Sequence, residues 1–167
     1  MTAMACEEAC WTDARSGRRF GYRLWRPPEP QALLVLLHGF GEHGGRYHHV
    51  ATTLAEQGIG VAAPDLWGHG RSGGARGDLG SVEQNIQALT TLTHDLLLAK
   101  FGQVAYTLFG HSVGGLMAIA WALQHPECLR GVIVQSPLLE VGCPIPWPKR
   151  CLASLAAVAW PTLSFSM

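Results

Sequence analysis

The sequence predicts an α/β fold built on a mostly parallel sheet with flanking helices. Continuous apolar runs of four to six residues occur at 33–37, 59–63, 104–109 and 131–134. Such runs are typical of strands that are buried on both faces. The segments between them have the apolar periodicity of helices. Strand and helix therefore alternate along the chain, which favours a parallel sheet with right-handed crossover connections.

Three helices are predicted from this periodicity. The first covers residues 47–55, with Gly58 as its C-cap. The second begins at a capping box formed by Ser81 and Gln84. The third covers 112–125 and ends where a proline follows. The apolar faces of the first two helices consist of Tyr47, Val50, Ala51, Leu54 and Ala55, and of Val82, Ile86, Leu89, Thr93, Leu96 and Leu97.

The remaining segments suggest how the chain is organised. Residues 18–25 alternate in character and end at two prolines, which predicts an antiparallel edge strand. We divide the chain into an N-terminal extension (1–14), the N-terminal part of the α/β domain (15–142) and the start of a helical cap or lid (143–167). The apolar stretch of the last segment is about a dozen residues long, which is too short to span a bilayer. A cap helix or a peripheral membrane contact is expected there.

The overall composition is that of a globular protein. Apolar residues make up 48% of the chain and charged residues 14%, and twelve basic residues balance twelve acidic ones. This balance argues against a nucleic acid or an anionic membrane as partner. The N-terminal segment has acidic residues and no apolar signal core, so a cytoplasmic location is expected. Five cysteines without framework or ligand spacing predict reduced thiols and no metal site.

The pattern G-x-S-x-G, which holds the nucleophile in many serine hydrolases, occurs twice, at 70–74 and at 110–114. The nucleophile turn requires a strand that leads into it and a helix that leaves it. Only Ser112 has both, and Gly110 and Gly114 remove the Cβ atoms that would clash in so tight a turn. Ser72 lies in a glycine-rich stretch that no helix follows. Ser112 is therefore the predicted nucleophile and Ser72 a loop residue.

A second motif, His-Gly-Phe-Gly at 38–41, follows the first apolar run. A strand that ends in this way places backbone amides beside the nucleophile turn, where they can stabilise the oxyanion of a tetrahedral intermediate. The predicted donors are the N–H groups of Phe40 and Val113. The alternative is a glycine-rich turn without a catalytic role.

Three motifs together carry a family resemblance. In order, "HGFGEHGGRY" (38–47), "PDLWGHGRSGG" (64–74) and "GHSVGG" (110–115) resemble the α/β-hydrolase superfamily. They are most similar to its monoacylglycerol lipase and lysophospholipase branch, which is also called serine aminopeptidase S33-like. The resemblance covers most of residues 15–140. It implies an α/β-hydrolase fold, a serine esterase acting on a monoacyl lipid or a related small ester, and no cofactor.

The resemblance also maps site residues onto this sequence. It implies that Ser112 is the nucleophile and that Phe40 and Val113 supply the oxyanion-hole amides. A supporting loop, held in place by polar contacts of Glu42, His43 and Arg46, is implied around them. The full supporting set consists of His38, Gly39, Gly41, Glu42, His43, Arg46, Gly110, His111 and Gly114.

The general base is missing from the expected position. In this fold the triad follows the order Ser, Asp or Glu, His. No Asp follows Ser112, and the one later histidine, His125, precedes both later glutamates. Thirteen residues of helix separate His125 from Ser112, which is about 20 Å at 1.5 Å per residue. His125 is therefore predicted to be a helix C-terminal residue favoured by the dipole.

Upstream histidines are the alternative source of a base. His38, His43 and His111 lie near the nucleophile turn or the oxyanion motif, and Asp65 could support one of them. The resemblance favours a different explanation, because family members continue through a helical cap and further strands that carry the Asp and the His. On that basis this chain is similar to the N-terminal portion of a hydrolase, with the cap and the last strands absent.

Two hypotheses follow for the function. The first is a serine ester hydrolase that is inactive or weakly active as this chain alone. The second is a non-catalytic fragment or pseudoenzyme that acts as an interaction module. Under the second hypothesis, the apolar run at 131–134 forms an exposed sheet edge that favours self-association.

Overall fold

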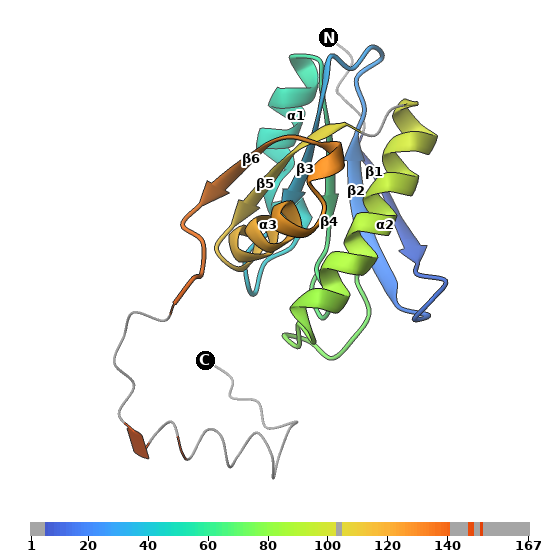
Figure 1. The fold of residues 1–167 in the computed structure, drawn as a ribbon. Coiled ribbons are helices and arrows are strands. Elements are labelled where there is room, and N and C mark those ends of the chain that lie inside the picture. The colour runs from blue at the N-terminus through green and yellow to red at the C-terminus, as the bar shows by residue number, and fades with distance from the viewer. Residues whose placement is uncertain (1–5, 103–104, 141–146, 149–150, 152–167) are drawn as a thin grey trace.

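A computed structural model describes residues 6–102, 105–140, 147, 148 and 151 of the 167-residue chain. Figure 1 shows a single twisted sheet flanked by helices. Its six strands lie in the order β1-β2-β4-β3-β5-β6. Their bounds are β1 (Cys6–Thr12), β2 (Arg19–Trp25), β3 (Ala32–Leu37), β4 (Ile59–Pro64), β5 (Tyr106–His111) and β6 (Leu129–Gln135).

Helices cover both faces of the sheet. These are α1 (His48–Glu56), α2 (Val82–Phe101) and α3 (Val113–Gln124), with short 3-10 turns at Gly44–Tyr47 and Pro126–Cys128. On one face α2 and α3 bury the larger core, which includes Phe20, Leu108 and Trp121. On the other face α1 packs through Ala51 and Ala55 against a smaller core.

The parallel part of the sheet confirms the predicted fold class. The four apolar runs form β3, β4, β5 and β6, and their pairings β4–β3, β3–β5 and β5–β6 are all parallel. Because these strands share one direction, their carboxyl ends lie together along one end of the sheet. Ligands bind at the carboxyl ends of the strands in open α/β sheets.

Residues 18–25 form an antiparallel strand as predicted, but the prediction that this strand lies at the edge of the sheet is wrong. That segment is β2, and β1 pairs with it antiparallel along its whole length, from Cys6 opposite Trp25 to Thr12 opposite Arg19. β1 lies within the segment set apart as an N-terminal extension. Its sequence, "CEEACWT", gives a weak strand signal because an edge strand exposes polar side chains that an inner strand cannot.

Two helix ends differ in detail from the prediction. Ser81 is the N-cap of α2 and accepts the Gln84 N–H at 3.4 Å. The side chain of Gln84 instead accepts from Arg18, so only half of the capping box is formed. The C-cap of α1 is Gln57, and Gly58, at φ +80, is the residue after it.

The predicted cap segment, 143–167, lies almost entirely outside the described residues. None of the described helices is both long and apolar enough to cross a membrane. The four described cysteines, Cys6, Cys10, Cys128 and Cys151, are free thiols.

Candidate active site

Ser112 lies on a sharp turn between β5 and α3. β5 ends at His111, α3 begins at Val113, and Ser112 between them has φ 52 and ψ −116. A positive φ is costly for a residue with a side chain and persists only where the surrounding structure enforces it. The serine side chain is thereby lifted from the carboxyl end of a central strand, which is how α/β-hydrolases present a nucleophile.

The two glycines of the motif allow the turn to pack. A Cβ atom on Gly110 would lie 2.2 Å from the carbonyl oxygen of Gly114. A Cβ atom on Gly114 would lie 2.3 Å from the carbonyl oxygen of Leu37 and 2.5 Å from that of His38. Both contacts are with backbone, which cannot rotate away. The G-x-S-x-G spacing therefore reflects close approach between the serine turn and the end of β3.

We expect Gly114→Ala to destabilise the chain by about 2 kcal/mol, because its Cβ would force the start of α3 away from the fixed backbone at the end of β3. Gly131→Ala on β6 is the matched control, since a Cβ atom there would meet no atom within 4 Å. Urea unfolding of both variants measures the difference. Equal stability of the two variants would contradict the close packing described here.

The His-Gly-Phe-Gly loop lies against the serine turn. A Cβ atom on Gly39 would be 3.3 Å from Ser112 Cβ and 3.2 Å from His111 Cδ2. Among the described residues, neither the Phe40 N–H nor the Val113 N–H donates a hydrogen bond to a protein acceptor. Two free backbone donors therefore belong to the two segments that meet at Ser112, and Val113 also begins a helix whose dipole favours negative charge.

Glu42 holds the His-Gly-Phe-Gly loop in place through hydrogen bonds and an ion pair. Its Oε2 accepts the Gly39 N–H at 3.2 Å and the Tyr47 hydroxyl at 3.1 Å, and its Oε1 lies 3.4 Å from Arg46 Nε. Burial alone would raise the pKa of Glu42, but these donors outweigh it and the pKa is lowered. Burial and the Glu42 carboxylate raise the pKa of Tyr47 to about 12. The loop is thus held by an ionised carboxylate, a neutral phenol and a partly exposed Arg46.

His38 holds the start of the loop from inside the core. It is fully buried, its Nδ1 lies 2.7 Å from the Gly39 carbonyl, and its Nε2 accepts the Leu66 N–H at 2.9 Å. Because Leu66 N–H must donate, His38 is neutral with its proton on Nδ1. Burial lowers its pKa to about 4. With both nitrogens engaged, His38 is a structural residue, and its alternative role as a base is wrong.

Asp65 connects this loop to neighbouring segments of the chain through its carboxylate. Its fully buried carboxylate accepts the Gly44 N–H at 2.7 Å and the Arg71 N–H at 2.8 Å, and it pairs with Arg23 Nη1 at 3.2 Å. Arg23 is also paired with Glu8 of β1 at 2.7 Å. Both oxygens of the Asp65 carboxylate are already occupied by these donors. The expectation that Asp65 could support an upstream histidine as base is therefore wrong.

The remaining candidate histidines do not complete a triad. His43 is exposed and borders a pocket of about 350 Å³ with Glu8 and Arg23, away from the serine turn. The ring of His111 lies beside Gly39, and its buried Nδ1 has no hydrogen-bond partner among the described residues. Within the same residues, no histidine is hydrogen-bonded to the Ser112 hydroxyl.

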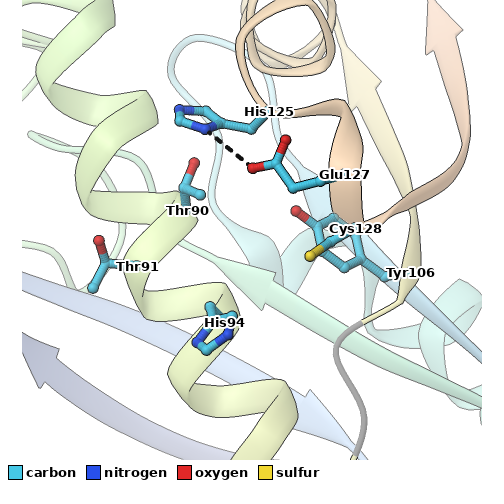
Figure 2. Close-up of a pocket in the computed structure, with 7 residues that line it drawn as sticks. All are labelled: Thr90, Thr91, His94, Tyr106, His125, Glu127 and Cys128. Atoms are coloured by element: carbon cyan, nitrogen blue, oxygen red, sulfur yellow. Dashed lines mark ion pairs between the residues drawn. The ribbon is translucent and has the colours of Figure 1, made fainter.

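His125 lies at the far end of α3, as expected. It is the C-cap of that helix, whereas Ser112 is the N-cap. It borders a pocket of about 340 Å³ formed with residues of α2 and the 3-10 turn before β6, and its Nδ1 is 3.6 Å from Glu127 Oε1 (Figure 2). This pocket shares no lining residue with the serine turn or the His-Gly-Phe-Gly loop.

The second G-x-S-x-G serine has a structural role. Ser72 is buried, donates its hydroxyl to the Asp65 carbonyl at 2.6 Å and accepts the Gly21 N–H at 3.0 Å. It therefore fixes the loop after β4 to β2. This agrees with the prediction that Ser72 is a loop residue.

Sequence reasoning missed what three residues that shape the site do. His69 is buried beneath the loop, with its ring 5.3 Å from that of the exposed Phe40 in an edge-on arrangement. Tyr47 donates to Glu42, and Arg23 neutralises Asp65. His69 lies in the "GHG" of the second motif, and Tyr47 ends the first motif only five residues from Glu42, so both had a local signal. Arg23 pairs with a residue 42 positions away, which no local pattern encodes. No group of three or more His, Cys, Asp or Glu side chains in the described part could hold a metal ion.

The comparisons with known proteins identify the family of this chain. The family described as serine aminopeptidase, S33, matches residues 28–167. A monoacylglycerol lipase of Mycolicibacterium smegmatis is 34% identical over 125 residues, which are 74% of this chain and 44% of that protein. The monoglyceride lipase of Rattus norvegicus is 37% identical over 119 residues, or 70% of this chain and 39% of that protein.

A solved structure shows the same fold. The monoacylglycerol lipase of Paleococcus ferrophilus has a TM-score of 0.69 and 36% identity, covering 87% of this chain and 53% of that chain. The chain thus spans about half, or less, of the length of these relatives. Fold and family match agree: the chain belongs to the serine aminopeptidase S33 family of α/β-hydrolases and is a homologue of the monoacylglycerol lipases.

Proposed function

We propose that this chain carries the nucleophile and the oxyanion hole of a serine ester hydrolase of the monoacylglycerol lipase type. The observation that supports this most directly is the strained Ser112 turn beside a loop with a free backbone donor. The Phe40 and Val113 N–H groups are the proposed oxyanion donors. Loss of one such donor typically costs about 3 kcal/mol of transition-state stabilisation.

The proposed reaction has two acyl-transfer steps and uses no cofactor. The Ser112 hydroxyl oxygen attacks the ester carbonyl carbon, its proton passes to a general base, and the negative charge on the former carbonyl oxygen is bound by the two amides. The bond to the alcohol then breaks, and the alcohol leaves with that proton. Water next attacks the acyl-serine, releasing the carboxylic acid and regenerating the hydroxyl.

Among the described residues, no histidine is hydrogen-bonded to the Ser112 hydroxyl. His38 is engaged on both nitrogens, Asp65 is committed to Arg23 and two amides, and His125 lies at the far end of α3. We therefore propose that the base comes from a polypeptide segment that completes the hydrolase fold. Without it, activity is weak, because triads stripped of their members retain only about 10³–10⁴-fold over water.

The substrate class proposed is a monoacyl lipid or a related small ester. This rests on the relatives named monoacylglycerol or monoglyceride lipase, and on a Bacillus subtilis homologue named phospholipase YtpA that is 33% identical over 117 residues. The partly exposed Phe40 at the proposed oxyanion hole would give an acyl chain an apolar contact.

Prolonged incubation with a fluorophosphonate probe tests Ser112. We expect slow labelling of the wild-type chain at Ser112 and none in Ser112→Ala, because the turn presents the hydroxyl and the oxyanion hole binds the phosphonyl oxygen. Ser72→Ala is the matched control, and it should retain labelling per folded molecule as judged by circular dichroism. Labelling that persists in Ser112→Ala, or no labelling of the folded wild type, would contradict the proposal.

A further inference from the structure

The pocket of about 340 Å³ beside His125 lies at the opposite end of β5 and α3 from the serine turn. Tyr106, which lines it, is the first residue of β5, and His125 is the C-cap of α3, whereas Ser112 follows β5 and is the N-cap of α3. We call it the α2–α3 pocket. Its volume is within the range of small-molecule sites, about 300–1,000 Å³. Its lining consists of Thr90, Thr91 and His94 of α2, Tyr106 of β5, and His125, Glu127 and Cys128 at the end of α3 and in the 3-10 turn after it.

The Tyr106 hydroxyl is a polar group in this pocket that lacks a partner. Tyr106 is only 4% exposed, and its hydroxyl makes no hydrogen bond to any of the described residues. Figure 2 shows the hydroxyl directed toward the side of the pocket that Thr90 and Glu127 border. Buried tyrosine hydroxyls usually find a partner, because a buried donor without one bears an uncompensated desolvation cost. The unpaired phenol therefore indicates that a ligand group belongs in this pocket.

Trp121 does not satisfy this hydroxyl. The two rings lie edge-on with their centroids 6.2 Å apart, and the buried indole N–H of Trp121 has no hydrogen-bond partner of its own among the described residues. An indole N–H only donates, so a closer approach would still leave the Tyr106 O–H without an acceptor. Burial raises the pKa of Tyr106, so the phenol keeps its proton at neutral pH. The α2–α3 pocket thus contains an unused O–H donor.

The threonines of α2 supply the complementary acceptors. The hydroxyl of Thr90 donates to the Ile86 carbonyl at 2.8 Å, and that of Thr91 donates to the Gln87 carbonyl at 3.0 Å. A hydroxyl has one proton and two lone pairs, so a threonine that has given its proton to its own helix can only accept from a ligand. A ligand group between Tyr106 and a threonine must therefore accept from the first and donate to the second. A hydroxyl group does both.

Charge and shape define the rest of the ligand. The described lining residues include no lysine or arginine, and His125 is paired with Glu127 at 3.6 Å, as His94 is with Asp95 at 3.7 Å. An anionic ligand would find no unpaired cation here to replace its hydration, so a neutral ligand is favoured. The lining is mostly apolar, and three of its side chains are the rings of Tyr106, His94 and His125. Such a lining favours an aromatic ligand.

We propose that the α2–α3 pocket is a binding site for a small neutral phenol, meaning a single aromatic ring that carries one hydroxyl. The ligand hydroxyl accepts the O–H of Tyr106 and donates to Thr90 Oγ1, and its ring packs between the imidazoles of His94 and His125. The site is independent of the proposed function, because the pocket shares no lining residue with the serine turn or the His-Gly-Phe-Gly loop.

Titration of the full 167-residue chain with phenol at neutral pH, followed by calorimetry, tests the proposal. Toluene and benzoate are the matched probes, since toluene replaces the hydroxyl by a methyl group and benzoate adds a charge. We expect phenol to bind in a 1:1 ratio and more tightly than either. Toluene would leave the Tyr106 O–H buried without an acceptor, and benzoate would lose its hydration without gaining a counter-charge.

Substitutions separate the two hydrogen bonds. Tyr106→Phe should lower the affinity for phenol relative to toluene at least about tenfold, because one hydrogen bond and its penalty when unmade are both removed. The same variant should be no less stable than the wild type in urea, since the hydroxyl has no protein partner to lose. Thr90→Val should also weaken phenol binding. Thr53→Val is its matched control, because the Thr53 hydroxyl donates in the same way to the His49 carbonyl at 3.0 Å, but on α1, and should leave binding unchanged.

Cys128 gives an independent readout of where phenol binds. Its free thiol lines the α2–α3 pocket, whereas the free thiol of Cys10 is exposed on β1. Bound phenol should slow the alkylation of Cys128 by iodoacetamide and leave the rate at Cys10 unchanged, as measured from the masses of the labelled peptides. Equal protection of both thiols, or of neither, would place any bound phenol outside this pocket and overturn the proposal.

The other outcomes also have distinct meanings. Absence of phenol binding would show that water alone occupies the pocket, and equal affinities for phenol and toluene would show that the hydroxyls of Tyr106 and Thr90 do not recognise the ligand. Loss of stability in Tyr106→Phe would show that the phenol already has a partner. Each of these results would overturn the proposal. Ser112→Ala should bind phenol as the wild type does, so a failure of the proposed function would leave this site standing.

Discussion

Asp65→Asn is expected to destabilise the chain by about 3–5 kcal/mol, the usual cost of removing one partner from a buried ion pair. The reason lies in the three groups that donate to this carboxylate. Gly44 N–H donates to Oδ1, Arg71 N–H to Oδ2, and Arg23 to both. Either orientation of an asparagine amide would place an NH₂ group against an N–H donor, and Arg23 would lose its buried counter-charge.

The measurement is the free energy of unfolding in urea at neutral pH. Asp78→Asn is the control, because Asp78 is exposed and accepts a single turn N–H from Gly80, which an asparagine can also accept. That variant should change stability by no more than about 0.5 kcal/mol. A similar small effect of Asp65→Asn would show that the buried network contributes little to the fold around the serine turn.

Acidification is expected to remove roughly 3 kcal/mol of stability through His38 alone. Burial holds its pKa at about 4 in the folded chain, against 6.5 for an ordinary histidine, and each pKa unit corresponds to about 1.4 kcal/mol. The folded pKa is depressed, so the unfolded chain binds more protons between these values. The stabilising contribution is fully present above pH 6.5 and is lost as the pH falls to 4.

Protonation of His38 would also break the hydrogen bond from Leu66 N–H to Nε2, which anchors the His-Gly-Phe-Gly loop. The test compares the pH dependence of unfolding between pH 7 and 4 for the wild type and for His38→Gln, whose slope should be flatter. His94→Gln, at an exposed position on α2, should keep the wild-type slope. If His38→Gln also keeps that slope, the buried neutral histidine is not what makes the chain acid-sensitive.

Much of the fold could be predicted because its signals are local. Buried parallel strands such as β3 and β5 are apolar on both faces, and the tight turn at Ser112 admits only glycine at 110 and 114. β1 was missed for the opposite reason, since an edge strand with paired glutamates lacks the apolar pattern of an inner strand. Its presence places β2 inside the sheet.

The sequence by itself determined the α/β class and the order of the motifs along the chain, and it indicated Ser112 rather than Ser72 as the nucleophile, because the strand, glycine and helix context of each serine is encoded in neighbouring residues. Only the tertiary structure decided what His38, Asp65 and Ser72 do. Each makes its contacts with segments distant along the chain, such as Leu66, Arg23 and Gly21. Hydrogen bonds and burial across such distances depend on how the strands are brought together, and no local pattern records them.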